Sequence, residues 1–159
     1  MNKITFIICC LIATYSQAQS QMPNVQLKNL ENNYKNVYKD YSETDKVYVF
    51  SFWATWCAPC INELEAIKEN YSEWKKEVDF EVVAISIDDS RTMRRIKPLV
   101  NGKSWKYEIL LDTNQELKRA LQINNIPHVI VVKNQKVEYV HNGYVEGGEE
   151  ELFEKIKAL

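Results

Sequence analysis

The sequence predicts an α/β fold in which helices flank a mixed central sheet. Residues 46–53 (KVYVFSFW) are mostly β-branched or aromatic, which is typical of a buried strand. Residues 58–76 follow that strand closely, and their apolar side chains fall within one arc of a helical wheel. Residues 147–159 carry acids at their start and lysines near their end, as a helix favours. With the segments between them, these stretches give the order βα βα βα ββα.

Two short stretches before this core predict an added hairpin at the N-terminal end of the domain. Residues 25–27 and 34–38 alternate apolar and polar side chains, as strands with one buried face do. The segment around them is polar and rich in asparagine. We therefore expect this hairpin at an edge of the sheet.

The middle of the chain predicts a second strand followed by a second helix. Residues 78–87 are again apolar and β-branched, and residues 90–100 have apolar side chains on one side of a helical wheel. Pro98 is expected to kink this helix or to end it early, because proline lacks the backbone N–H that a helix uses.

The last third of the chain predicts a strand, a short helix and a hairpin. Residues 107–111 form a short apolar run, and residues 113–116 (TNQE) have the sequence of a capping box that opens a helix through Leu121. Residues 129–132 and 136–140 are separated by a short polar break, which predicts an antiparallel hairpin.

Length and charge limit the possible functions. The chain has 159 residues, which suits one domain with an ordinary core. Its formal charge is -2, and its lysines and glutamates are interleaved. This pattern gives no basic surface, so we expect no nucleic acid as a partner.

The first residues predict a secretory signal peptide over residues 1–18. Lys3 precedes an apolar run at 4–15, and small residues follow it up to Ala18. The run is too short for a membrane-spanning helix, which needs about 20 apolar residues. We expect cleavage after Ala18, an exported domain over residues 19–159 and a periplasmic location. An anchor formed by an uncleaved N-terminal segment is the alternative.

Two cysteines remain once the signal peptide is removed, because Cys9 and Cys10 leave with it. A disulfide between Cys57 and Cys60 closes a loop too small to stabilise the fold much. At the start of a helix, however, unpaired N–H groups and the helix dipole stabilise a thiolate. Cys57 is therefore predicted to be an exposed attacking thiolate, and Cys60, inside the apolar arc, the resolving thiol. Pro59 presets the backbone for the first helical turn.

The stretch FWATWCAPC at 52–60 and the later NIPH at 125–128 resemble the thioredoxin superfamily, and within it the TlpA/ResA-like secreted thiol-disulfide oxidoreductases. The resemblance covers most of the chain from about Val25. It implies a thioredoxin-like fold in which the N-terminal hairpin and an inserted helix and strand at 90–111 are additions. It also implies a cis peptide at Ile126–Pro127, beside the cysteines, whereas only about 5–6% of X-Pro bonds are cis in general.

Several residues around the motif are candidates for contact with a substrate protein. Trp56 is next to the nucleophile and is predicted to form a wall of the docking surface, together with Pro59 and with Ile126–Pro127. Trp53 fits equally well as a core residue. His128 is a candidate for the docking surface, although a histidine that faces a neighbouring strand is the more common case.

Two positions, 51 and 63, are candidates for a buried acid near the cysteines. Thioredoxin has an aspartate in the strand six residues before the first cysteine, and here Ser51 takes that place. Glu63 resembles in position a glutamate of ResA-like proteins and lies at the border of the buried arc. It is a candidate catalytic residue that takes the proton of Cys60 or tunes both thiols. The alternative is an acid that only suits the first turns of a helix.

The resemblance implies a thiol-disulfide oxidoreductase that reduces disulfides of exported proteins and is recharged by a membrane electron donor. Cytochrome c maturation and general disulfide reduction are the two roles that it suggests. We expect a monomer with no bound metal, nucleotide or flavin, whose redox-active group is the disulfide between Cys57 and Cys60. The residues between the cysteines do not fix the direction of electron flow, because related dithiol proteins span roughly -270 to -120 mV.

Two other functions are alternatives for this sequence. A copper-binding or metallochaperone-type protein of related fold would use Cys57, Cys60, His128 and His141, but the chain has a single Cys-x-x-Cys and no His-x-x-x-His. A peroxidase of peroxiredoxin type needs threonine or serine three residues before a lone reactive cysteine. Here that residue is Ala54.

Overall fold

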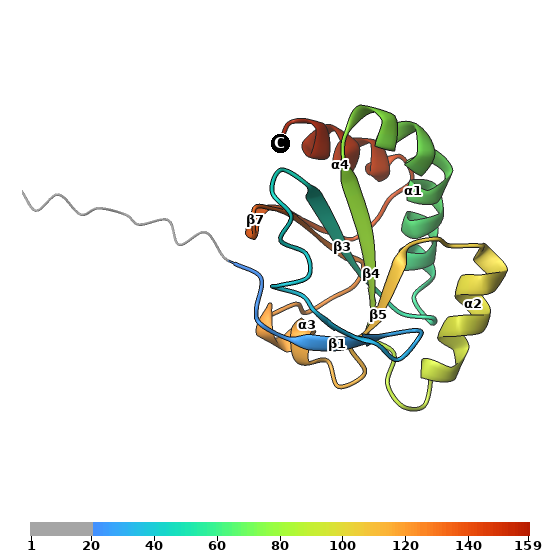
Figure 1. Cartoon of the computed structure of the whole chain (residues 1–159). Helices are drawn as coiled ribbons and strands as arrows, with labels where there is room; N and C mark the ends of the chain where they lie inside the picture. The colour runs from blue at the N-terminus through green and yellow to red at the C-terminus, as the bar shows by residue number, and fades with distance from the viewer. Residues whose placement is uncertain (1–20) are drawn as a thin grey trace, which may run out of the picture.

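One mixed sheet organises the computed structural model, which describes residues 21–159. The predicted signal peptide, with Cys9 and Cys10, lies outside the described residues. The strand order is β2-β1-β5-β4-β3-β6-β7, and helices cover the sheet (Figure 1). The strands are β1 (Gln26–Asn29), β2 (Tyr34–Asn36), β3 (Val47–Trp53), β4 (Phe80–Ser86), β5 (Glu108–Leu111), β6 (His128–Lys133) and β7 (Lys136–Asn142). The helices are α1 (Ala58–Glu77), α2 (Ile96–Lys103), α3 (Glu116–Ala120) and α4 (Gly148–Lys157), with a 3₁₀ turn η1 (Met93–Arg95) before α2.

Strand β3 is the centre of the sheet, as its apolar sequence predicts. All seven of its residues are buried. It pairs in parallel with β4 and antiparallel with β6, so it has no free edge. Both faces of β3 are covered, which explains why its sequence shows no alternation.

The two faces of the sheet carry different layers. Ser51 of β3 contacts Glu63 of α1, and α1 lies beside α4, where the rings of Trp74 and Phe153 stack at 4.4 Å between centroids. Phe50, the neighbour of Ser51, packs edge-on against Tyr41 at 5.4 Å. Successive residues of a strand point to opposite faces. The helix pair α1 and α4 therefore covers one face, and Tyr41 packs against the other, on Tyr48 and Phe50.

Both predicted hairpins are present. β1 pairs antiparallel with β2 and also with β5, so the N-terminal hairpin extends the sheet at one edge. β6 and β7 form the second hairpin. Its turn residues, Asn134 and Gln135, have φ values of 50° and 64°, as a two-residue type I′ turn requires.

Of the two effects expected of Pro98, a kink or an early end of the helix, the early end is wrong. Helix α2 begins at Ile96 and continues to Lys103. Pro98 therefore lies in the first turn, where the backbone N–H groups have no partner within the helix. A proline at such a place costs no hydrogen bond.

The predicted capping box at 113–116 is also wrong, although the helix that it opens is present as α3. The carboxylate of Asp112 accepts hydrogen bonds from the N–H groups of Leu117 and Lys118, at 3.2 Å and 2.8 Å. Asp112 is buried, and burial raises the pKa of its carboxyl group in spite of these bonds. The free N–H groups at the start of α3 are thus bonded by Asp112, one residue before the expected cap, Thr113.

Candidate active site

The turn between β3 and α1 carries the cysteine motif. β3 ends at Trp53, and Cys57 is the residue that caps α1, with an extended backbone at φ -97° and ψ 92°. The N–H of Cys57 donates to the carbonyl of Ala54 at 3.0 Å and closes the turn. Pro59 lies in the first turn of α1, as expected. The first sulfur is therefore held at a helix N-terminus, where a thiolate is stabilised.

Cys57 and Cys60 form a disulfide, with an Sγ–Sγ distance of 1.98 Å and a Cα–Cα distance of 5.3 Å. Cys60 is fully buried, which confirms the inward orientation predicted from the wheel. Cys57 is only 6% exposed, so the expectation of a freely exposed first sulfur is wrong for this disulfide form. The Cys57 sulfur is bonded to the sulfur of Cys60, which is fully buried, and therefore lies against the interior. Of the two, Cys57 still has the greater access to solvent.

The peptide bond between Ile126 and Pro127 is cis, as the resemblance implies. Pro127 comes directly before β6, whose first residue, His128, pairs with Phe52 of β3. This register places Pro127 at the same end of the sheet as the cysteine turn. Ile126 is half-buried and Pro127 is buried. The carbonyl of Pro127 accepts a hydrogen bond from the N–H of Gly143 at 2.9 Å, which ties this loop to the end of β7.

Glu63 is a buried acid on the inner side of α1. Its side chain accepts a hydrogen bond from the hydroxyl of Ser51 at 3.2 Å, and Glu63 is only 2% exposed. Burial raises the pKa of Glu63 from 4.5 to about 7, Glu149 adds to the rise, and the bond from Ser51 opposes it. An acid that merely suits the start of a helix would face solvent. Glu63 is therefore a core residue of α1 and not an acid that only suits the start of a helix.

The two tryptophans of the motif have different environments. Trp56 is 58% exposed, directly beside Cys57. Trp53 is fully buried, and its ring packs edge-on against Trp105 at 5.0 Å. Its indole N–H has no acceptor within residues 21–159. Trp53 is therefore a core residue, and Trp56 is available to a docking partner.

His128 is directed away from helix α1. It lies opposite Phe52, whose ring meets the imidazole edge-on at 6.1 Å, on the face of the sheet away from Ser51. Its Nδ1 is paired with the side-chain oxygen of Asn142, and burial lowers the pKa of the imidazole. His128 thus has the common role of a histidine that faces a strand neighbour.

The ligands of a metal site are not brought together. His141 is on β7 opposite Val129, and its Nδ1 lies 3.4 Å from the hydroxyl of Tyr139. Cys57 and Cys60 are joined to each other. Over residues 21–159, no three side chains of histidine, cysteine, aspartate or glutamate gather in a way that would hold a metal ion. The copper-binding alternative therefore has no preformed site in the described part of the chain.

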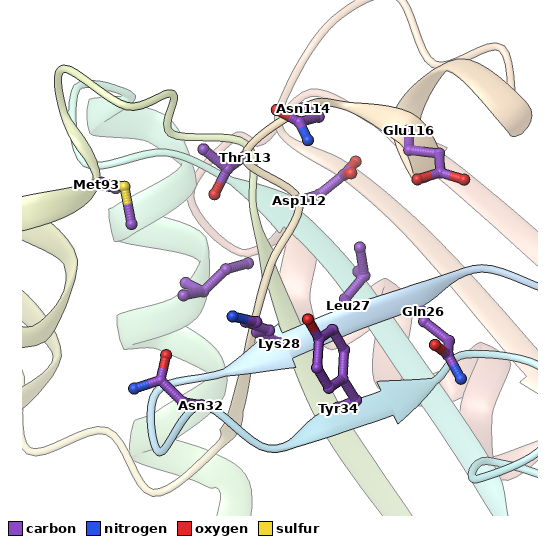
Figure 2. Close-up of a pocket in the computed structure, with 11 residues that line it drawn as sticks. Gln26, Leu27, Lys28, Asn32, Tyr34, Met93, Asp112, Thr113, Asn114 and Glu116 are labelled. Atoms are coloured by element: carbon purple, nitrogen blue, oxygen red, sulfur yellow. The ribbon is translucent and has the colours of Figure 1, made fainter.

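Two hollows in the surface differ in their relation to the cysteines. One, of about 330 Å³, lies between the β1–β2 hairpin and the loop before α3, and Figure 2 shows Lys28, Tyr34 and Asp112 around it. The cysteine motif contributes nothing to its lining. The other, of about 460 Å³, borders Pro59. It is lined by Asn62, Glu65, Ala66, Glu69, Tyr144, Glu146 and Glu149.

Sequence reasoning missed one residue that contacts the motif. Asp88, just after the end of β4, bonds to Thr55 in the cysteine turn. A signal was available, because the carboxyl ends of neighbouring parallel strands meet at one edge of a sheet. An aspartate that follows the strand next to β3 is therefore close to the turn that β3 leads into.

Comparison with known proteins gives a consistent assignment. The profile of the AhpC/TSA family matches residues 18–140. A thiol-disulfide oxidoreductase named ResA, from Oceanobacillus iheyensis, is 28% identical over 123 residues, which are 76% of this chain and 62% of that protein. The chain thus spans less than two thirds of that relative's length.

Solved structures extend the comparison. The solution structure of an uncharacterized thioredoxin-like protein from Porphyromonas gingivalis is 42% identical, with a TM-score of 0.76 over 87% of this chain and 90% of that one. StoA from Bacillus subtilis has a TM-score of 0.66 at 20% identity, over 84% of this chain and 98% of that one. At such low identity, the second likeness shows the fold alone.

Proposed function

The chain belongs to the AhpC/TSA family and has a thioredoxin-like fold, and on this premise we propose that it is a thiol-disulfide oxidoreductase acting through Cys57 and Cys60. One observation carries the proposal. The two cysteines form a disulfide at the start of α1, with one sulfur fully buried and the other at the helix cap. This arrangement suits an attacking thiol and a resolving thiol.

The reaction moves two electrons from the reduced protein to a disulfide of its substrate. The thiolate of Cys57 attacks one sulfur of the substrate, the substrate disulfide breaks, and its other sulfur leaves as a thiolate that takes up a proton. The thiolate of Cys60 then attacks the Cys57 sulfur. The mixed disulfide breaks, the second substrate thiol is released, and Cys57 and Cys60 are left oxidised.

Glu63 is proposed to accept the proton that Cys60 loses in the second step. Both residues are buried on the inner side of α1, one helical turn apart. A pKa of about 7 lets the carboxyl group bind and release a proton near neutral pH. Ser51 holds this carboxyl group through its hydroxyl. The proposed proton acceptor is therefore on helix α1, whereas thioredoxin has its aspartate on the strand, at the position of Ser51.

The substrates are proposed to be disulfides of exported proteins, docked over Trp56, Pro59 and the loop at Ile126–Pro127. A membrane donor would return electrons to the oxidised pair, in cytochrome c maturation or in general disulfide reduction. The protein would work as an exported monomer that needs no bound cofactor. The names of the relatives support the chemistry, and the predicted signal peptide supports the export.

The test is a potential measurement joined to an activity assay. The protein is equilibrated with glutathione buffers of graded poise, and the fraction of Cys57–Cys60 disulfide gives its reduction potential. A potential nearer -270 than -120 mV supports a reductase. Reduction of a model protein disulfide is then compared for wild type and Cys57→Ser. Full activity in Cys57→Ser would refute the mechanism, and copper or zinc retained stoichiometrically through chelator washing would favour the metal-binding alternative.

A further inference from the structure

The end of strand β4 is bonded to the cysteine turn at two places. The N–H of Ile87 donates to the carbonyl of Trp53 at 2.9 Å. Asp88 follows, and its carboxylate accepts hydrogen bonds from Thr55, two residues before Cys57. The turn that presents the first sulfur is therefore attached to the neighbouring strand before it enters α1.

The contact between Asp88 and Thr55 has two points. One carboxylate oxygen accepts from the backbone N–H of Thr55 at 2.8 Å, and the other accepts from its hydroxyl at 2.7 Å. Bonds at the backbone and at the side chain fix both the peptide plane and the rotamer of Thr55. The hydroxyl of Ser86 donates a third bond to Asp88 at 2.9 Å, which orients the carboxylate itself.

Asp88 is buried, so its carboxylate depends on these hydrogen bonds in place of water. Asp88 is 1% exposed, and within residues 21–159 it is part of no ion pair. A buried carboxylate is costly unless hydrogen bonds replace its water. Two of the three bonds that do so come from Thr55. A movement of Thr55 away from Asp88 would leave a buried carboxylate without two of its three hydrogen bonds. This cost keeps the cysteine turn in place.

We propose that Asp88 is a positioning residue for the redox reaction, which acts through Thr55 to hold Cys57 at the cap of α1. The inference rests on the proposed function, because it gives Cys57 the role of nucleophile. On one side of Trp56 the turn is held by Asp88, and on the other side the N–H of Cys57 bonds to Ala54. Without the Asp88 contact, the first sulfur loses its fixed relation to the free N–H groups of α1, and its thiolate is less stabilised.

The test measures the reactivity of Cys57 in the reduced protein. The rate of its alkylation by iodoacetamide is followed by the mass of its peptide over a range of pH, which gives the pKa of the thiol. Thr55→Val removes the hydroxyl and keeps the shape and the charge of Asp88. We expect it to slow alkylation at neutral pH by about two- to fivefold, the size of a helix-terminus effect on a thiolate. Thr55→Ser restores the hydroxyl and should restore the rate.

A second variant separates positioning from simple charge. Asp88→Asn removes a negative charge, which alone would lower the pKa of Cys57 and speed its alkylation. It also replaces one carboxylate oxygen by an NH2 group, so the hydroxyl of Thr55 has to accept instead of donate and both bonds lose their charge assistance, which should slow alkylation if positioning dominates. We expect slowing, as in Thr55→Val. Asp89→Asn is the matched control, because Asp89 bonds to Arg91 and not to the turn, and its rate should equal that of wild type.

The outcomes are distinct. Slowing in both Thr55→Val and Asp88→Asn supports the proposal. An unchanged rate in Thr55→Val, whether or not Asp88→Asn is faster, overturns it. If Asp88→Asn fails to fold, as thermal unfolding would show, the Thr55 pair alone decides. The alkylation assay needs no redox partner, so the proposed oxidoreductase function can fail in the glutathione experiment while these rates still differ.

Discussion

The inner and outer sides of the first turns of α1 have opposite properties. The inner side carries Cys60 and Glu63, which are almost without solvent contact. The outer side carries Pro59, which is exposed, and Trp56, which is 58% exposed, lies in the turn just before the helix. The start of helix α1 thus has an exposed side, where a substrate can be attacked, and a buried side, which carries the resolving thiol. The sulfur of Cys57, which is proposed to attack the substrate, lies between the two sides, and the sulfur of Cys60, which is proposed to release it, is buried.

Electrostatics follow the same division. On the inner side, burial holds the pKa of Glu63 near neutrality. On the outer side, glutamates line the hollow beside Pro59 and keep contact with water. Glu149 links the sides, because it borders the hollow and its charge raises the pKa of Glu63. Glutamates are therefore buried on one side of the helix and border a surface hollow on the other.

The largest expected effect comes from removing the inner sulfur. Cys60→Ser leaves Cys57 able to attack a substrate but without a resolving thiol. We expect turnover to fall by at least about two orders of magnitude, with the mixed disulfide accumulating as a covalent adduct. Gel electrophoresis without reductant measures the adduct. In Cys57→Ser no adduct should form, and an adduct of equal amount there would mean that the inner sulfur is the nucleophile.

The division of α1 into two sides was largely predictable from the sequence. Apolar spacing placed Cys60 inside, and the buried strand β3 placed Cys57 at a helix start. These features are local, because they depend on residues close together in the chain. The cis bond at Pro127 was expected only from the resemblance, since general frequencies favour trans.

What the sequence did not predict depends on contacts between distant segments. Asp88 meets Thr55 across 33 positions of the chain, and only the parallel pairing of β3 with β4 brings them together. Likewise, the helical wheel placed Glu63 at the border between the buried and exposed faces of α1. The hydrogen bond from Ser51 on the sheet holds its side chain on the buried face. The capping of α3 by Asp112 was missed because the cap lies one residue outside the expected motif.

The next effect concerns the buried acid. Glu63 has a pKa of about 7 in the folded protein against an ordinary 4.5, so the folded protein binds this proton more tightly than the unfolded chain. The resulting stability is complete below about pH 4.5 and is lost as the pH rises through about 7. Glu63→Gln should therefore be more stable than wild type by up to about 3 kcal/mol at about pH 8, and nearly equal to it at about pH 4.

Urea unfolding at several pH values measures this difference. Glu69→Gln is the matched control, because Glu69 is an exposed glutamate on the same helix, and we expect it to leave the pH dependence unchanged. If the free energy of unfolding has the same pH dependence in Glu63→Gln and in wild type, the pKa of Glu63 is not raised by burial.

The smallest effect is expected on the outer side, at Trp56. An exposed side chain adds little to folding, so Trp56→Ala should change the free energy of unfolding by no more than about 0.5 kcal/mol. If the ring is a wall of the docking surface, its loss should lower kcat/KM for a protein disulfide by about tenfold, as truncation of an aromatic contact does. Glutathione contacts far less of this surface than a folded protein does, so its rate of exchange should change much less. Tyr34→Ala is the control, because Tyr34 is 64% exposed but lies on the N-terminal hairpin. Equal losses with protein substrate in both variants would mean that docking is not confined to the cysteine end of the molecule.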